Sequence, residues 1–403
     1  MADGVQGLKP SAGLALASVQ FFFTLGWTVY VIFLPGLLNA AGLAAFWLPI
    51  LLMADQLIFA IMDIAFGVVA DRMANGYRKL ARLLLWLSTV SAAAFLFLPI
   101  FGPVSPMLLI ITLGIWVISA SVVRAPTLVL LAKQAKAAQQ GRLVVCYAGG
   151  MAAASALSPF IGVMLKGADP RLPFAISAIT LLIAVVVLLH FSGREAPKPD
   201  GNEPPAITFK AYLPLLLALA LASGGFQLHA FLNAAPQYLA HTSKENLPWL
   251  LPLLWVGFFV ALTGVGTFIK RFGPLTVAVG GIVLTAFSSF ASSAANSLAL
   301  LVLFQLLSGI GWAAAFAGLM EQASIFGTRG AEGLFMGSFF AVLALTSFAR
   351  IGFVSQWLPQ SPILQKLQPT LPAAMLLVAC LIAAFYGVMR RRQALAETGV
   401  GNS

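Results

Sequence analysis

Long apolar runs, separated by short stretches of Gly, Pro and charged residues, fill the chain from end to end. A helix needs about 20 mainly apolar residues to cross a bilayer, and only a helix or a closed barrel satisfies its backbone hydrogen bonds there. The runs are solid and do not alternate, which excludes barrel strands. The pattern therefore predicts an all-α membrane protein with twelve transmembrane helices, at residues 17–40, 46–71, 82–101, 105–132, 143–165, 172–192, 212–240, 248–269, 274–295, 298–326, 333–357 and 371–390.

The composition excludes several other classes of protein. Of the 403 residues, 60% are hydrophobic and 9% are charged, whereas a soluble domain carries about 25% charged residues. Two cysteines cannot form a disulfide framework, and no Cys/His cluster suggests a metal site. The net charge of +11 does not indicate nucleic acid, because the basic residues form no face and have no aromatic platform beside them.

The basic residues instead gather in alternate loops. Cytoplasmic loops of membrane proteins collect Lys and Arg, so this asymmetry predicts that both termini lie in the cytoplasm. The loops on the other side keep Lys166, Arg171, Lys244 and Lys366. The loops predicted to be cytoplasmic carry Lys9, Arg72, Arg78, Lys79, Arg82, Lys133, Lys136, Arg142, Arg194, Lys198, Lys210, Lys270, Arg271, Arg329, Arg390, Arg391 and Arg392.

The chain also divides into two similar halves. A polar stretch rich in Pro, Gly and charge, GREAPKPDGNEPPAIT, follows the sixth span. It predicts six-helix bundles at 1–192 and 212–403, joined by a cytoplasmic linker at 193–211. The segment GVVADR after the second span is repeated as GTFIKR after the eighth. Such a parallel six-plus-six repeat is typical of transporters that move two bundles about a central site.

The segment from Gly67 to Lys79, GVVADRMANGYRK, makes the resemblance specific. It resembles the loop signature between helices two and three of the major facilitator superfamily: a Gly, three residues, Asp-Arg, then a Gly and a basic pair. It departs from that signature by one extra residue before Gly76 and by Tyr77. The resemblance covers nearly the whole chain. It implies two six-helix bundles related by a pseudo-twofold axis, and a transporter that is not an enzyme.

The resemblance also implies a gate at the cytoplasmic side. Asp71 would face the amino end of the eleventh helix near Gly333, where the helix dipole favours a carboxylate, and Arg72 and Arg78 would hold it in place. Gly67 would let the two bundles approach closely. The alternative is that these charges only mark a cytoplasmic loop. The weaker second copy of the signature contains Gly266, Lys270 and Arg271.

A few ionisable residues lie inside the predicted spans, where each costs at least about 2.5–3.5 kcal/mol and is a functional candidate. Counting helical rise, we expect Asp63 to reach Arg124. The same count, with the packing of spans two and eleven that the resemblance implies, predicts that Asp55 forms an outer latch with Arg350, present in the inward-open state and broken when the outer side opens. Such pairs can also merely orient helices. A carboxylate that changes protonation between states can couple transport to protons, and Asp63 and Glu321 are the first candidates. The complete set is Asp55, Asp63, Arg124, His229, Glu321 and Arg350.

Other polar and aromatic residues are candidates for the walls of a central cavity. Trp and Tyr also serve as packing or interface residues, and His229 can be a hydrogen-bonded core residue. Arg124 and Arg350 would suit an anionic group on a substrate, unless acids satisfy both. The candidate wall residues are Gln20, Trp27, Tyr30, Trp116, Gln227, Asn233, Trp255, Gln305 and Trp312.

These features predict a secondary active transporter that moves a small organic solute across a bacterial inner membrane by alternating access. No phosphate-binding loop occurs, so we expect a proton or other ion gradient as the energy source, and no cofactor. The expected partners are the solute and the lipid bilayer, with the chain working as a monomer and binding no nucleic acid. Two alternatives stay open: an exporter of amphipathic drugs or lipids, and a non-transporting receptor or assembly factor with the same fold.

Overall fold

The computed structural model describes residues 9–73, 77–132, 137–192, 209–327 and 331–397. Twelve helices in these ranges are long and apolar enough to cross a membrane, as the hydropathy pattern predicts. The first half of the chain holds α1 (Pro10–Ala40), α2 (Trp47–Arg72), α3 (Tyr77–Phe101), α4 (Pro106–Ala120), α5 (Ala125–Ala132), α6 (Ala137–Met164) and α7 (Arg171–Phe191). The second half holds α8 (Phe209–Leu228), α9 (Ala234–Leu239), α10 (Leu247–Leu250), α11 (Pro252–Phe272), α12 (Pro274–Ser293), α13 (Leu298–Gly327), α14 (Glu332–Gly352), α15 (Pro362–Leu367) and α16 (Leu371–Glu397).

The fourth span lies where 105–132 predicts it, at Pro106–Ala132, but its helix is broken in the middle. A single 3-10 turn, Ser121–Val123, follows α4, and Arg124 then leaves helical geometry with φ −87° and ψ −101°. Pro126 explains the break, because it has no N–H to donate and its ring would clash with the carbonyl of Val122 in a continuous helix.

Two further spans contain wide π turns. His229–Asn233 joins α8 to α9, and Phe353–Trp357 follows α14. A proline follows closely in each case, Pro236 and Pro359, so the helical hydrogen-bond ladder is already incomplete there. Such turns are common at functional sites.

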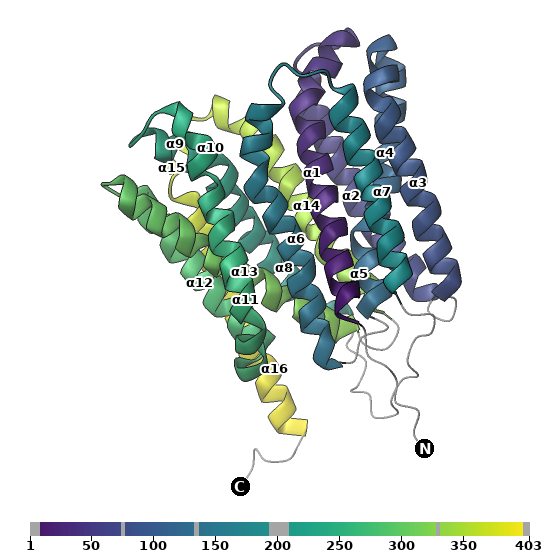
Figure 1. The fold of residues 1–403 in the computed structure, drawn as a ribbon. Coiled ribbons are helices and arrows are strands. Elements are labelled where there is room, and N and C mark those ends of the chain that lie inside the picture. The colour runs from purple at the N-terminus through teal and green to yellow at the C-terminus, as the bar shows by residue number, and fades with distance from the viewer. Residues whose placement is uncertain (1–8, 74–76, 133–136, 193–208, 328–330, 398–403) are drawn as a thin grey trace.

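The two halves repeat one packing arrangement. In the first half, α1 packs against α6 and α7, and α3 packs against α4 and α7. In the second half, the corresponding helix α8 packs against α14 and α16, and α12 packs against α13 and α16. Figure 1 shows the first-half helices side by side, with most of the second-half helices beside them. Residues 193–208 lie outside the described residues, so the boundaries 1–192, 193–211 and 212–403 stay a prediction.

The halves meet along two seams. Helix α14 lies along α2, and α6 lies against α11 and α13. Figure 1 shows α14 passing behind α6 toward α2, and α14 also packs against α8 and α13 of its own half. These five seam helices therefore carry the contacts that must change if the two halves move relative to each other.

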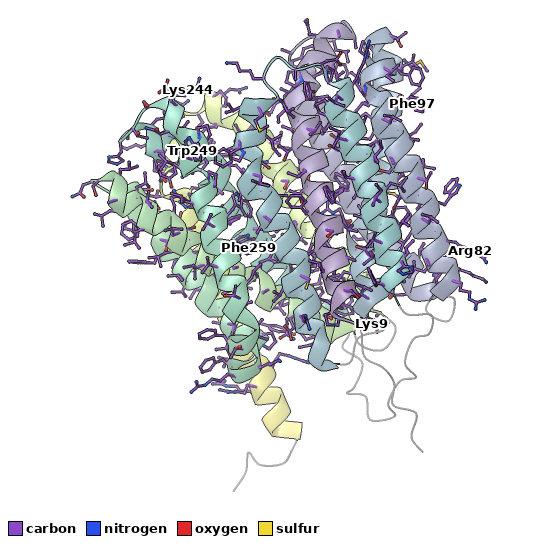
Figure 2. The ribbon with its side chains drawn as sticks, in the orientation of Figure 1. Lys9, Arg82, Phe97, Lys244, Trp249 and Phe259 are labelled. Carbon is purple, nitrogen blue, oxygen red and sulfur yellow. The ribbon has the colours of Figure 1, made fainter. Side chains whose placement is uncertain are left out.

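One end of the molecule is strongly basic. We call it the basic end; it holds the start of α1 and the end of α16. Figure 2 shows Lys9 and Arg82 there, with Lys244 at the opposite end. Lys133, Lys136, Arg194, Lys198 and Arg329 lie outside the described residues. The described basic residues of this end are Lys9, Arg72, Arg78, Lys79, Arg82, Arg142, Lys210, Lys270, Arg271, Arg390, Arg391 and Arg392.

Candidate functional site

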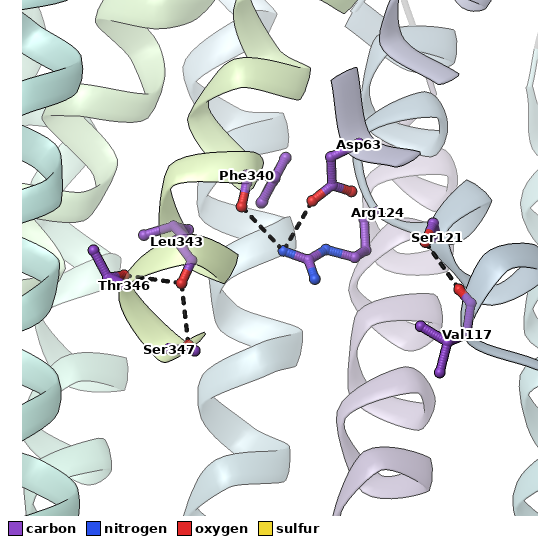
Figure 3. A network of polar contacts seen from close by, with 8 residues as sticks. All are labelled: Asp63, Val117, Ser121, Arg124, Phe340, Leu343, Thr346 and Ser347. Carbon is purple, nitrogen blue, oxygen red and sulfur yellow. Dashed lines mark hydrogen bonds and ion pairs between the residues drawn. The ribbon is translucent and has the colours of Figure 1, made fainter. Parts of the chain in front are cut away.

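An ion pair lies at the centre of the molecule. Nη2 of Arg124 is 3.2 Å from Oδ2 of Asp63, whose side chain is fully buried. The same Nη2 donates a hydrogen bond of 3.3 Å to the carbonyl oxygen of Phe340, on α14 of the second half (Figure 3). The guanidinium also lies over the ring of Phe59, 4.8 Å from its centroid. Arg124 therefore joins an acid of the first half to the backbone of the second.

The break in the fourth span sets the position of Arg124. Gln20 of α1 donates to the carbonyl of Val123, directly before the break, over 2.8 Å, and the hydroxyl of Thr127 donates to the same carbonyl. Gln20 is only 2% exposed. The sequence predicted that Gln20 lines a cavity wall. In the structure its amide instead donates a hydrogen bond to the backbone at the helix break.

Few protein groups stabilise the negative charge of the buried Asp63. Within the described part of the chain, its Oδ1 has no hydrogen-bond partner, and Arg124 is its one ion-pair partner. A buried charge is costly unless it is paired and hydrogen-bonded. The charge on Asp63 therefore depends on where Arg124 lies.

Asp55 and Arg350 do not form the predicted outer latch in this conformation. The hydroxyl of Tyr30 donates to Oδ2 of Asp55 over 2.6 Å. Arg350 instead donates from Nε to Oε1 of Gln227 over 3.2 Å, and its guanidinium lies 5.0 Å from the ring centroid of Phe231. Tyr30 and Gln227 thus have structural partners that the sequence did not indicate.

The aromatic candidates lie mainly in packed clusters. Trp27 stacks on Trp116 with centroids 5.9 Å apart, and Trp312 stacks on Phe226 at 4.4 Å. Trp116 and Trp312 are 4% and 3% exposed, so these repeat-related residues pack the two bundles and do not line an open wall. Trp27 and Trp255 are partly exposed and remain the better wall candidates.

The polar residues of the seventh and tenth spans are deeply buried. His229 and Gln305 have no exposed surface. Gln305 donates to Oε1 of Gln237, while neither ring nitrogen of His229 has a hydrogen-bond partner among the described residues. Asn233 pairs with Gln368 through two hydrogen bonds of 3.1 Å. These residues belong to the interior of the second half.

Asp71 closes the basic end, at the place that the family resemblance implies. Its two carboxylate oxygens accept hydrogen bonds from the backbone N–H groups of Gly333 and Leu334, over 2.7 and 2.8 Å. These groups lie in the first turn of α14, where helix N–H groups lack intrahelical partners. Arg72 and Arg78 are exposed, and their role in holding Asp71 in place stays a prediction.

Glycine lets the two helices approach at this gate. A side chain on Gly67 would overlap the carbonyl of Gly333, and one on Gly337 would overlap the carbonyl of Asp63. The sequence singled out Gly67 but not Gly337, whose four-residue spacing from Gly333 is the available signal. The α2–α14 seam is thus a backbone-to-backbone contact.

The second copy of the signature does not form an equivalent gate, so that expectation is corrected. Nothing lies within 4 Å of a Cβ built on Gly266, and Lys270 and Arg271 are exposed. A cation cannot cap the amino end of a helix. Glu321 of α13 lies close to α6 at this end, its Oε2 being 2.9 Å from where a Cβ on Gly141 would stand, and Lys270 of the second copy acts on its charge.

The basic end is closed in this conformation. Buried apolar residues of both halves form one continuous cluster that extends to the basic end. A second cluster, mainly from α1 to α4, also takes in Ala341 and Ala344 of α14. Tyr147 of α6 and Phe340 of α14 meet across the interface, with centroids 5.1 Å apart. Solvent on the basic side therefore does not reach the Asp63–Arg124 pair.

A cavity of about 450 Å³ lies elsewhere, between α1, α6 and α11. Its lining is largely apolar and includes the exposed residues Leu14 and Phe259, and Figure 2 shows Phe259 projecting from the flank. No charged residue lines it. It suits lipid chains and not a polar solute, so the site considered below is the one around Arg124 and Arg350.

Three features define the class of this protein. It has twelve spans in two repeated halves, buried ions at the interface between the halves, and at one end an acid that caps a helix. The family model for the Major Facilitator Superfamily matches residues 16–350. The chain belongs to this superfamily, whose members are transporters and not enzymes. The sequence matches none of the curated proteins with which it was compared.

Solved structures share the fold over nearly its whole length. The E. coli fucose:proton symporter FucP, in the outward conformation, has a TM-score of 0.69 at 14% identity, over 93% of this chain and 98% of its own. A bacterial homologue of the iron transporter ferroportin has a TM-score of 0.71 at 15% identity, over 94% and 100%. The human organic anion transporter MFSD10 has a TM-score of 0.68 at 15% identity, over 93% and 100%.

Proposed function

We propose that this chain is a proton-coupled secondary transporter that moves a small organic solute by alternating access. The basic end faces the cytoplasm of the cell, as the distribution of Lys and Arg favours. The observation that carries the proposal is the double contact of Arg124, with Asp63 in its own half and with the Phe340 carbonyl in the other. It ties the charge of one acid to the relative position of the two halves.

Protonation of Asp63 would change the balance at this contact. A neutral Asp63 leaves Arg124, whose side chain is only 12% exposed, as a largely buried cation without a counterion, which is costly. Opening the basic end would relieve that cost by admitting water to Arg124. Acid therefore favours the open basic end, and loss of the proton to the cytoplasm restores the ion pair and the closed end.

The gate supplies the second requirement of alternating access, a closure that is stable and reversible. The bonds from Gly333 and Leu334 to Asp71 and the glycine contact of α2 with α14 involve no covalent or metal link. They can break when the halves separate. A receptor or assembly factor would not need a closure whose stability depends on a buried acid. The proposed dependence of the gate on Asp63 therefore favours transport.

Replacing Asp71 with Ala is expected to weaken the gate. The substitution removes both acceptors of the first turn of α14, and losing a helix cap costs about 0.5–2 kcal/mol. Hydrogen exchange should become faster at the N–H groups of Gly333 and Leu334. The measurement is exchange mass spectrometry on the reconstituted protein, with Asp169→Ala in an exposed loop as the control. Unchanged protection would contradict the gate.

Replacing Asp63 with Asn tests proton coupling without knowledge of the solute. Spin labels on Arg82→Cys and Arg390→Cys, one in each half at the basic end, report its opening in a background with Cys146 and Cys380 replaced by Ser. In the parent, acidic pH should lengthen the distance between the labels. Asp63→Asn should give the long distance at every pH, because it mimics the protonated acid.

The control for this experiment is Asp169→Asn, an exposed acid outside the membrane spans, which should keep the pH response of the parent. A pH response that survives in Asp63→Asn would remove Asp63 from the coupling site. A parent distance that does not change with pH would overturn the proton-coupled mechanism itself.

A further inference from the structure

Arg350 is a cation inside a membrane span without an acid to balance it. Its Nε donates to Gln227 and its guanidinium lies over Phe231. Within the described ranges, its Nη1 and Nη2 atoms have neither a hydrogen bond nor an ion pair. Ionisable residues within transmembrane segments are rare and almost always pair or mark a substrate pathway.

The acids of the neighbouring spans have other partners. Asp55 accepts the hydroxyl of Tyr30, Asp63 is paired with Arg124, and Glu321 lies beside Gly141 at the basic end. Tyr30 and Asp55 are both at least 98% buried, so their hydrogen bond belongs to the packed core of the first half. Among the described residues, no acid therefore balances the charge of Arg350.

The surroundings of Arg350 fix its orientation. Gln227 donates from Nε2 to the hydroxyls of Ser223 and Thr346, over 3.0 and 2.9 Å. This sets its Oε1 to accept from Arg350 and from Ser347. One edge of the guanidinium is thereby held, and the two Nη groups stay available, in the fork geometry that binds a carboxylate or phosphate group with two parallel hydrogen bonds.

Apolar surface lies next to this fork. Phe231 is 57% exposed, and its ring centroid is 6.4 Å from that of Trp255 on α11. Phe231 lies in the π turn that follows α8, and Trp255 belongs to α11, which packs against α6 of the first half. A solute that pairs with Arg350 would place its remaining atoms against these rings.

We infer that Arg350 binds the anionic group of an organic solute, a carboxylate or phosphate, whose apolar body lies against Phe231 and Trp255. This inference rests on the proposed transport function and names its substrate class. Arg124 cannot take the same role while it is paired with Asp63. The first half thus carries the proton site and the second half the anion site.

Binding of three small probes to the purified full chain in nanodiscs tests the inference. Benzoate and phenyl phosphate carry an anionic group on an aromatic ring, and benzamide is the uncharged counterpart. At least one anion should bind about tenfold or more tightly than benzamide, because the charge-assisted pair is absent with the amide. The Arg350→Gln variant should lose that preference, whereas Arg350→Lys, which keeps the charge, should retain part of it.

The matched control is Arg171→Gln, an exposed arginine at the opposite end, which should bind all three probes as the parent does. Equal binding of anions and benzamide by the parent would overturn the anion site, as would an anion preference that persists in Arg350→Gln. If Arg350→Gln does not fold, binding of the preferred anion to Phe231→Ala, with Phe272→Ala as its control, decides whether this is the site. The anion should bind more weakly to Phe231→Ala, and unchanged binding would overturn the inference. The spin-label response of Asp63 uses no probe, so the proposed function fails or stands independently of this result.

Discussion

Replacing Gly67 with Val is expected to open the basic end of the molecule. A side chain at this position overlaps the carbonyl of Gly333, and that carbonyl belongs to the backbone of α14 and cannot rotate away. Overpacking of this kind costs about 1–3 kcal/mol, which changes a two-state ratio about 5- to 150-fold. The distance between labels on Arg82→Cys and Arg390→Cys should therefore lengthen at every pH.

Gly266→Val is the matched control, because Gly266 has the same place in the second copy of the signature. Nothing lies within 4 Å of its Cβ position, so the same substitution should leave the distance unchanged. Equal responses of the two variants would show that the contact of α2 with α14 does not hold the closed state. A lengthening confined to Gly67→Val would locate the closure at this seam.

The fold followed from the sequence because the bilayer restricts the choice of structure. Twelve apolar runs must be helices, and the limits of most of them differ from the structure by only a few residues. The first helix begins earlier than predicted, at Pro10, because proline is favoured in the first turn. The breaks at Arg124 and His229 were missed, although Pro126 and Pro236 were visible signals for them.

Side-chain partners were harder to predict than helices. Helical rise placed Asp63 and Arg124 at one depth, and they meet. The same argument, together with the family's packing of spans two and eleven, placed Asp55 beside Arg350 in the state that is open at the basic end. That end is closed here, where Asp55 accepts from Tyr30 and Arg350 donates to Gln227, so the latch stays a prediction. Tyr30 of α1 lies closer to Asp55, and that neighbour is fixed by helix packing, which the chain's local pattern does not contain.

The repeat at Gly266 shows a related limit of motif matching. The six residues from Gly266 to Arg271 align with those from Gly67 to Arg72, yet only the first copy meets a backbone across the interface. The first copy has an acid, Asp71, where the second has Lys270. That single difference in charge decides which copy can cap a helix amino end.

Replacing Arg124 with Gln is expected to destabilise the protein strongly. The variant leaves Asp63 fully buried and without its one ion-pair partner among the described residues. Removing one member of a buried ion pair costs about 3–5 kcal/mol. The free energy of unfolding, measured by titrating the reconstituted protein into denaturing detergent, should fall by about that amount.

The double variant Arg124→Gln with Asp63→Asn should recover most of this loss. Both charges are then absent, and two neutral amides can bond to each other and to the Phe340 carbonyl that Arg124 now reaches. Recovery of stability without recovery of the pH response would separate the two roles of the pair, since stability needs only matched charge whereas coupling needs an acid that titrates. If the double variant is as unstable as Arg124→Gln, the interaction energy of the pair is small and the closed basic end depends on the α2–α14 seam alone.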